Sequence, residues 1–325
     1  MLAKLLLGFL VLLLTVSVVA LVTAPATLVN RALAPKIVGD LDVWLAAQER
    51  GISAPETIIA NTEKRIRWYD GVRNSKTPYA IVYLHGFSAT RQEIAPVSEV
   101  VAEALGANLF ETRLAGHGLS EDALVNVRAE DWLDDAAEAL AIGAAIGDKV
   151  IVLGTSTGAT LALAMIDHET FAKVSTIVQI SPNFALKDTT SELLTWPGGP
   201  QLARMMVGDT VSWEPDNELR ARYWSTRYPI DALVEMMRLV KFARAKLPLK
   251  LRQSLLTVYS PKDQVLDVAR TRAALELIES PHRKEVEILT SGDPGHHVLA
   301  GAIASPQNTQ QMAQLIIEFI ATDRL

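Results

Sequence analysis

The sequence predicts an α/β fold in which a mostly parallel β-sheet carries helices on both faces and a helical cap is inserted above it. Apolar strand-like runs alternate with helical runs along residues 61–181, and the alternation resumes over 254–325. Between these two parts, over residues 182–253, the alternation stops. Alternating apolar strands and helices are typical of a parallel sheet with both faces covered. We therefore predict a core made of 61–181 and 254–325, with 182–253 as the cap.

The N-terminus holds an uncharged apolar run, Leu5–Val22, that follows Lys4. As a helix it would span about 27 Å, close to the thickness of the hydrocarbon core of a bilayer. We predict that residues 1–24 form a single transmembrane anchor, with the rest of the chain on the extracytoplasmic (periplasmic) side. The alternative is a signal segment that is cleaved near Ala24-Pro25-Ala26, which would give a secreted protein.

The remaining elements are expected from their periodicity. Residues 25–60 are predicted to be a linker with one amphipathic helix over Val38–Arg50, which Gly51 would end. The first strands are expected at Arg65–Tyr69 and Ala80–Leu84. Further strands are predicted at 107–111, 149–153, 174–180, 254–259 and 285–289, and further helices at 96–105, 129–146, 230–246 and 307–320.

The most informative motif is Gly154-Thr155-Ser156-Thr157-Gly158. It follows the apolar run Val150–Leu153 and precedes the apolar helical run Ala159–Met165. A strand, then G-x-S-x-G, then a helix is typical of a nucleophile elbow, in which a tight turn holds a serine hydroxyl above the end of a sheet. The glycines are needed because side chains two residues either side of the serine would clash where strand and helix cross.

A serine hydroxyl is a poor nucleophile at neutral pH and needs a base, which needs an orienting acid in turn. Asp263 follows the 254–259 strand, and His296 and His297 follow the 285–289 strand. Serine, acid and histidine therefore stand in the chain order found in parallel-sheet enzymes that use this motif. Asp293 and, less well, Asp267 are alternatives for the acid.

The negative oxygen formed by attack of such a serine needs backbone N–H donors. Thr157, directly after the nucleophile, is expected to supply one, and Phe87, in the loop after the 80–84 strand, the other. His85 is expected to anchor this loop by hydrogen bonds, and His117, between two glycines, to have a structural role.

Composition excludes several classes of function. The net charge of −6 has no basic cluster beside it, so a nucleic-acid surface is not expected. The absence of cysteine excludes thiol catalysis, disulfides and cysteine–zinc sites. No glycine-rich phosphate loop or histidine–carboxylate metal spacing is found, so no cofactor and no metal are expected.

These motifs, taken in order, resemble those of the α/β-hydrolase superfamily, and most of all its capped branch of monoglyceride lipases and serine-aminopeptidase-like hydrolases. The resemblance covers residues 60–322. It implies Ser156 as nucleophile, Asp263 as acid and the histidine before Val298, His297, as base in preference to His296. The motifs that carry it are Leu84-His85-Gly86-Phe87, Arg113-Leu114-Ala115-Gly116-His117-Gly118, Gly154–Gly158, Asp263 and His297.

The expected reaction is hydrolysis of a carboxylic ester through an acyl-enzyme. The cap holds three of the six tryptophans and four of the seven methionines, which are candidates for packing or for an apolar acyl pocket. The expected partners are a small-molecule or lipid-like ester and, through the N-terminal helix, a membrane. A thioesterase, a serine peptidase or an acyltransferase could use the same three residues, and a peptidase would want cap carboxylates such as Glu214, Asp216 or Glu218. Outside enzymes, the alternative is a catalytically silent binding module.

Overall fold

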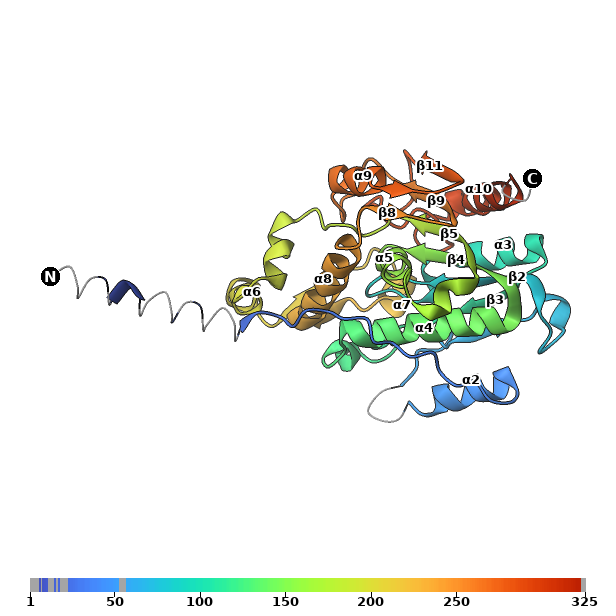
Figure 1. Cartoon of the computed structure of the whole chain (residues 1–325), viewed down its shortest axis with the longest axis horizontal. Helices are drawn as coiled ribbons and strands as arrows, with labels where there is room; N and C mark the ends of the chain where they lie inside the picture. The colour runs from blue at the N-terminus through green and yellow to red at the C-terminus, as the bar shows by residue number, and fades with distance from the viewer. Residues whose placement is uncertain are drawn as a thin grey trace.

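A mixed seven-stranded sheet forms the centre of the computed structural model, which describes residues 6, 8–10, 15, 17, 23–52 and 57–322 (Figure 1). The strand order is β1-β3-β2-β4-β5-β9-β11, and each neighbouring pair is parallel except β1 with β3. This confirms the predicted mostly parallel α/β sheet. The strands are β1 (Arg65–Arg67), β2 (Thr77–Leu84), β3 (Asn108–Glu111), β4 (Gly147–Thr155), β5 (Val174–Ile180), β9 (Ser254–Tyr259) and β11 (Arg283–Glu287).

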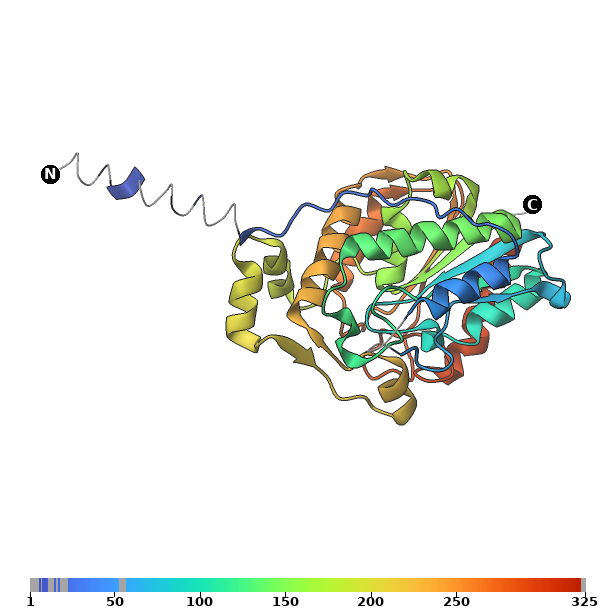
Figure 2. The same cartoon turned by 90° about the horizontal axis from the view of Figure 1, so that it is seen from below.

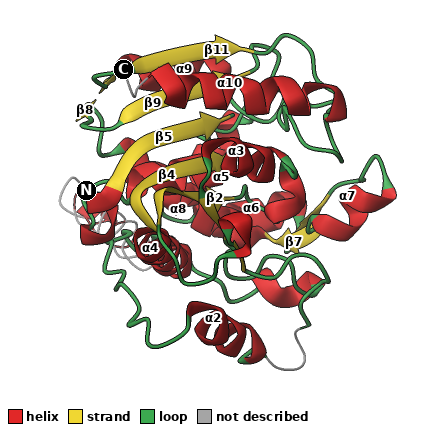
Figure 3. Ribbon diagram, turned by 90° about the vertical axis from the view of Figure 1, so that its right-hand side faces the viewer, coloured by secondary structure: helices red, strands yellow, loops and turns green. Residues whose placement is uncertain are grey.

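Helices cover both faces of the sheet because its central strands are apolar on both sides. In β2, Val82 and Leu84 pack into one buried cluster, whereas Ile81 and Tyr83 pack into the other. Successive side chains of a strand point to opposite faces, so one apolar run supplies both layers. The first face carries α4 (Ala129–Ile146) and α5 (Thr157–Ala164), with α8 (Ile230–Arg244) packed on α5, and the second carries α3 (Val97–Leu105) and α10 (Thr309–Thr322) (Figure 3).

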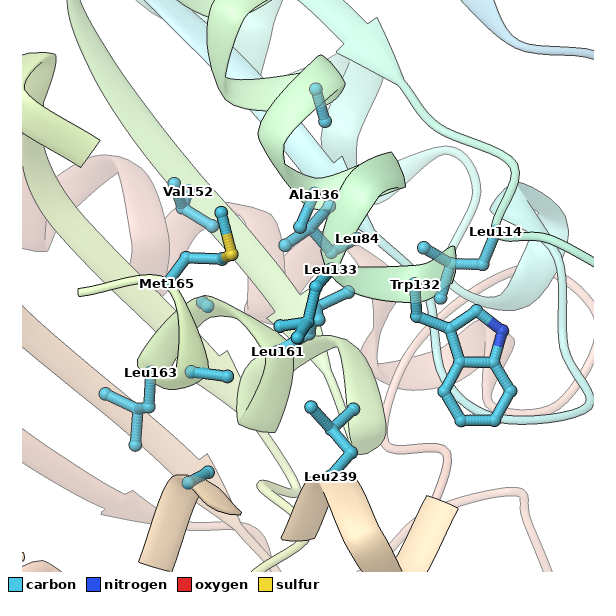
Figure 4. Packing of buried hydrophobic residues seen from close by; sticks show 14 of the residues in the cluster. Leu84, Leu114, Trp132, Leu133, Ala136, Val152, Leu161, Leu163, Met165 and Leu239 are labelled. Carbon is cyan, nitrogen blue, oxygen red and sulfur yellow. The ribbon is translucent and has the colours of Figure 1, made fainter. Parts of the chain in front are cut away.

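The buried cluster on the first face is the larger of the two, and part of it is shown in Figure 4. Leu161 of α5 lies next to Leu133 of α4, and Leu239 of α8 lies beneath α5. Because α5 begins at the residue after Ser156 and is buried along its length, this packing fixes the direction in which the serine turn leaves the sheet.

The chain between β5 and β9, the segment predicted as the cap and called the cap below, lies outside the sheet, with α6 and α8 to one side of the strands (Figure 1). Its helices are short except for α8, and β6 pairs antiparallel with β7. The elements of this segment are η5 (Thr189–Thr195), α6 (Gly199–Val207), β6 (Thr210–Ser212), α7 (Glu218–Tyr223), β7 (Arg227–Pro229), α8 and β8 (Leu249–Lys250). The other elements are α2 (Leu41–Arg50), α9 (Val268–Glu276), β10 (Ile278–Glu279), η1 (Tyr69–Gly71), η2 (Arg91–Glu93), η3 (Glu121–Leu124), η4 (Glu169–Lys173) and η6 (Pro306–Asn308).

Residues 25–40, predicted to be a linker, form an extended strap that crosses α8 and runs along α4 (Figure 2). The buried guanidinium of Arg238 on α8 donates from Nε to the Ala26 carbonyl at 2.7 Å. The His168 Nε2 donates to the Ala32 carbonyl, also at 2.7 Å. Leu28 and Ala32 are buried in the main cluster, so the strap is part of the packed fold.

The expectation of a membrane anchor at the N-terminus is corrected. Most of the Leu5–Val22 run lies outside the described residues. Across the ranges that the structure does describe, no helix has both the length and the apolar character needed to cross a bilayer. This finding contradicts the predicted transmembrane helix, and with it the membrane-anchored location that depended on that helix.

Candidate active site

Ser156 occupies a strained turn between β4 and α5. Its backbone has φ 51° and ψ −116°, a conformation that costs free energy for any residue with a side chain. The turn is possible because the two crowded positions on either side of it are glycines, which have no Cβ. A Cβ at Gly158 would lie 2.0 Å from the carbonyl oxygen of Leu84, and one at Gly154 would lie 2.7 Å from the backbone of Ala159.

The structure brings Ser156, His297 and Asp263 together at the carboxyl ends of β4, β9 and β11. His297 Nε2 lies 3.0 Å from Ser156 Oγ, and His297 Nδ1 lies 2.8 Å from Asp263 Oδ2. The other carboxylate oxygen, Oδ1, accepts the backbone N–H groups of Val265 at 2.7 Å and Leu266 at 2.9 Å. All three side chains are buried, and the acid has a fixed orientation in which only one oxygen faces the imidazole.

The charge around His297 favours its protonated form. Burial opposes that form, but the negative charge of Asp263 and its hydrogen bond to Nδ1 outweigh burial, and Glu93 and Asp293 add to them. The pKa of His297 is therefore raised above its ordinary value of 6.5. An imidazole whose protonated form is stabilised accepts the proton of a serine hydroxyl more readily.

The alternative residues lie elsewhere. His296 has a left-handed backbone (φ 51°), and its Nδ1 lies 3.0 Å from Ser291 Oγ. The ring of His297, and not that of His296, contacts Ser156. Asp267 caps α9 by accepting the N–H of Arg270 at 3.0 Å. Within the ranges described, no group of three or more metal-binding side chains is found.

Asp293 lies close to His297 but contacts its backbone, not its ring. Its Oδ2 accepts the N–H groups of His297 at 2.8 Å and Val298 at 3.0 Å, and its Oδ1 accepts from Arg220 at 2.7 Å. Burial alone would raise the pKa of Asp293, but the charge of Arg220 and the two N–H groups outweigh it and lower that pKa. Asp293 thus holds the loop that carries the histidine.

The loop that carries Phe87 is held on both sides by neutral histidines. His85 Nδ1 donates to the Gly86 carbonyl at 2.9 Å, and its Nε2 accepts from the backbone of the Arg113–Gly118 loop at 3.1 Å. His117 Nε2 accepts the Ser88 N–H at 3.0 Å. Burial lowers the pKa of His117 to about 4 and lowers that of His85 well below 6.5, so both rings stay uncharged with fixed tautomers. The peptide groups flanking Phe87 are therefore fixed.

A third buried group, Glu93, reaches the same loop from η2. Its Oε2 accepts the Gly86 N–H at 2.8 Å and the Tyr83 hydroxyl at 3.0 Å. A Cβ at Gly86 would lie 2.7 Å from Glu93 Oε1 and 3.3 Å from Ser156 Cβ, so both side chains border the space that a side chain at this position would occupy. Burial raises the pKa of Glu93.

Thr157 follows Ser156 directly in the chain, and Phe87 follows Gly86, at which a Cβ would lie 3.3 Å from Ser156 Cβ. Thr157 is the first residue of α5, and N–H groups in the first turn of a helix have no partner within the helix. The ring of Phe87 makes edge contacts with Tyr228 at 5.0 Å and Trp132 at 6.0 Å between ring centroids, which packs the loop against the cap. The assignment of these two backbone N–H groups as oxyanion donors stays a prediction.

Sequence reasoning did not assign Glu93 or Arg220 to this site and took Asp293 only as a rival acid. Glu93 and Arg220 stand in polar loop and short-helix segments without an apolar pattern, and each reaches the site only through the fold. The sole signal was the position of Asp293 four residues before His297.

The mostly parallel sheet order and the strained serine turn between β4 and α5 are those of the α/β-hydrolase class. Residues 75–293, more than half of the chain, match the family described as serine aminopeptidase, S33. The chain belongs to this family.

Comparison with known proteins points to the lipase-like members of the class. The chain is 25% identical over 214 residues to the thermostable monoacylglycerol lipase of Bacillus sp. (strain H-257), which covers 66% of this chain and 82% of that protein. Its fold is similar to a structure from work on LipS and LipT, two metagenome-derived lipolytic enzymes (TM-score 0.66, 16% identity, 82% of this chain and 100% of that one). It is also similar to the monoacylglycerol lipase of Paleococcus ferrophilus (TM-score 0.58, 13% identity, 80% and 99%).

Proposed function

We propose that this hydrolase cleaves carboxylic esters, with Ser156 as nucleophile, His297 as general base and acid, and Asp263 as the orienting acid. The observation that carries the proposal is the continuous hydrogen-bonded chain from Ser156 Oγ through both ring nitrogens of His297 to Asp263. Such an arrangement activates a serine for attack on an acyl carbon.

In the first half-reaction His297 Nε2 takes the proton of Ser156 as Oγ attacks the ester carbonyl. Asp263 keeps the proton of the ring on Nδ1 and stabilises the imidazolium that forms. The oxyanion is stabilised by the N–H groups of Phe87 and Thr157, and each such donor is typically worth about 3 kcal/mol in the transition state. His297 then protonates the leaving alcohol, and water repeats these steps to release the acid.

The far end of the acyl chain of the substrate is proposed to lie in a cavity of the cap, whose lining does not include Ser156, His297 or Asp263. The cavity has a volume of about 540 Å³ and is bounded by η5, α6, β6 and the start of α8. This volume is in the range of small-molecule sites, and a mostly apolar wall suits an aliphatic chain. Its apolar lining includes Leu193, Leu202, Ala203, Met206, Val211 and Leu233.

The positions of the cap carboxylates favour an ester substrate over a peptide that would be bound by its free amino terminus. Asp216 is paired with Arg220 at 3.1 Å, and Glu214 and Glu218 are exposed. The named relatives are monoacylglycerol lipases and lipolytic enzymes, which supports a lipid-like ester for this chain.

The test is hydrolysis of p-nitrophenyl esters from acetyl to palmitoyl by the full chain and by its Ser156→Ala variant. We expect turnover by the wild type and a loss on the order of 10⁴-fold or more in the variant, with an unchanged melting temperature. A folded wild type that hydrolyses no ester, or a variant that keeps its activity, would refute the proposal. Amino-acid p-nitroanilides and acyl thioesters, assayed in parallel, test the other reactions open to the same residues.

Filling the cavity tests the acyl site separately. Ala203→Phe on α6 should shift the preferred chain length toward shorter esters, because the new ring occupies cavity volume. Gln201→Phe, on the exposed side of the same helix, is the matched control and should leave the preference unchanged. An identical chain-length profile for wild type and Ala203→Phe would exclude this cavity.

A further inference from the structure

One segment of the cap, residues 213–225, contacts both loops of the candidate active site. The Ser225 N–H donates to the Ser88 carbonyl at 2.7 Å, directly beside Phe87. Trp224 packs in one buried cluster with Ala89 of the same loop and with Val298, which follows the histidine. The cap therefore adjoins the oxyanion loop and the histidine loop through one short stretch of chain.

Arg220 of α7 lies at the centre of this segment. Its Nη1 donates to Asp293 Oδ1 at 2.7 Å and to Asp216 Oδ2 at 3.1 Å. Its guanidinium carbon lies 5.6 Å from the ring centroids of both Trp213 and Trp224. A guanidinium held between rings and paired with a carboxylate that is 2% exposed has little freedom to reorient.

The partner of Arg220 is the group that holds His297 in place. Asp293 uses Oδ1 for Arg220 and Oδ2 for the N–H groups of His297 and Val298. Ser305 Oγ accepts the N–H of Asp293 itself at 3.1 Å and donates to the Val298 carbonyl at 2.6 Å. The path from the cap to the histidine thus consists of direct hydrogen bonds, from the half-buried Arg220 to the buried Asp293 and on to the backbone of His297.

We propose that Arg220 is a positioning residue for His297: its ion pair with Asp293 fixes the histidine loop and balances a negative charge that would otherwise stand unpaired beside the imidazole. The proposal rests on the function of His297 as the catalytic base. Under this proposal, His297 has the correct position and charge only when the cap is packed as observed.

The charge argument follows from the groups that surround His297. Asp263 contacts the ring, Glu93 and Asp293 add negative charge, and Arg220 is the cation paired with Asp293. Loss of Arg220 leaves the charge of Asp293 uncompensated next to the histidine. A nearby negative charge favours imidazolium, so the pKa of His297 should rise further, and less neutral base should be present near pH 7.

The experiment compares wild type, Arg220→Met and Arg222→Met. Arg222 lies on the same helix with an exposed side chain and serves as the matched control. For Arg220→Met we expect kcat on p-nitrophenyl butyrate to fall roughly ten- to hundredfold through misplacement of the histidine. We also expect the acid limb of the kcat/KM profile to move up by about 0.5–1 pH unit. Arg222→Met should match the wild type in both.

A second set of variants separates charge from packing. In Arg220→Met combined with Asp293→Asn, the unpaired charge is gone, so the acid limb should return to the wild-type midpoint or below it. Arg220→Lys keeps the charge but not the planar fork, and should keep the wild-type midpoint while kcat falls. A merely structural role for Arg220 would lower the melting temperature and leave the acid limb unmoved in every folded variant.

The titration of His297 is also read directly, without substrate, from its imidazole NMR signals in the wild type and in Arg220→Met. An upward shift in the variant supports the proposal, and equal titration midpoints in the two folded proteins overturn it. Failure of the ester assay in the wild type would instead refute the proposed function and leave this comparison intact. The two failures are therefore distinguishable.

Discussion

Replacing the acid by its amide, Asp263→Asn, probes the candidate site most sharply because the structure fixes how an amide must sit. Asp263 Oδ1 accepts two backbone N–H groups, from Val265 and Leu266, at 2.7 and 2.9 Å. In the variant the amide oxygen must take this place, since an NH₂ group there would face two donors. The NH₂ group then points at His297 Nδ1.

An NH₂ group opposite Nδ1 selects the wrong tautomer of the ring. Nδ1 must accept from it, so the proton of the neutral imidazole moves to Nε2, the nitrogen that has to take the proton of Ser156. The correct tautomer carries its proton on Nδ1, and this N–H donor would then face the NH₂ group of the amide, which is also a donor. We expect kcat to fall on the order of 10⁴-fold, equivalent to about 5.5 kcal/mol, the size of effect that wrong-tautomer variants of this kind of triad show.

The assay is p-nitrophenyl butyrate hydrolysis by Asp263→Asn and Asp293→Asn side by side, with circular dichroism and the melting temperature as checks of folding. Asp293→Asn keeps an oxygen that can accept the N–H groups of His297 and Val298, so it should lose no more than a few tens-fold. A loss below tenfold for a folded Asp263→Asn, or a larger loss for Asp293→Asn, would refute the reasoning.

Three further predictions follow from contacts described above. The raised pKa of His297 places the acid limb of kcat/KM above pH 6.5, and a midpoint below 6.5 in a profile from pH 5 to 9 would contradict it. Gly158→Ala should destabilise the fold by about 3 kcal/mol or more in urea unfolding, because its Cβ would meet the Leu84 carbonyl at 2.0 Å; an unchanged midpoint would show that the turn can relax. The pKa of His117 is about 4 in the folded chain and near 6.5 in the unfolded chain, so acid stabilises the unfolded state. The difference in the free energy of unfolding between wild type and His117→Leu should therefore decrease by about 3 kcal/mol as the pH falls from 7 to 4. A constant difference would argue against a neutral His117.

The sheet could be predicted because its central strands are apolar on both faces. Val174–Ile180 and Ser254–Tyr259 have the predicted bounds, and so does the helix Ala129–Ile146. The edge strand β11, Arg283–Glu287, begins two residues before its predicted start. Its sequence is mostly charged, because none of its side chains is fully buried at this edge of the sheet and a charged edge strand is readily tolerated.

The cap and the outer part of the site were less predictable. The helices α6 and α7 are nine and six residues long and bury few of these residues, so neither is long enough for its existence and bounds to be recognised from the sequence alone. Asp263 was predictable because it directly follows a strand that the pattern identifies. The contacts of Arg220 with Asp293 and of Glu93 with Gly86 join segments that only the fold brings together, so no local sequence pattern predicts them.

The strap has a practical consequence for where the folded unit begins. Ala26 supplies a hydrogen-bond acceptor to Arg238, whose guanidinium is otherwise matched by Glu130 and Glu235. A truncation placed just before α2 would strip that carbonyl from a buried cation and uncover the surface beneath Leu28. Recombinant versions that start near residue 25 should therefore have a higher melting temperature than versions starting near residue 40, although both retain every strand of the sheet.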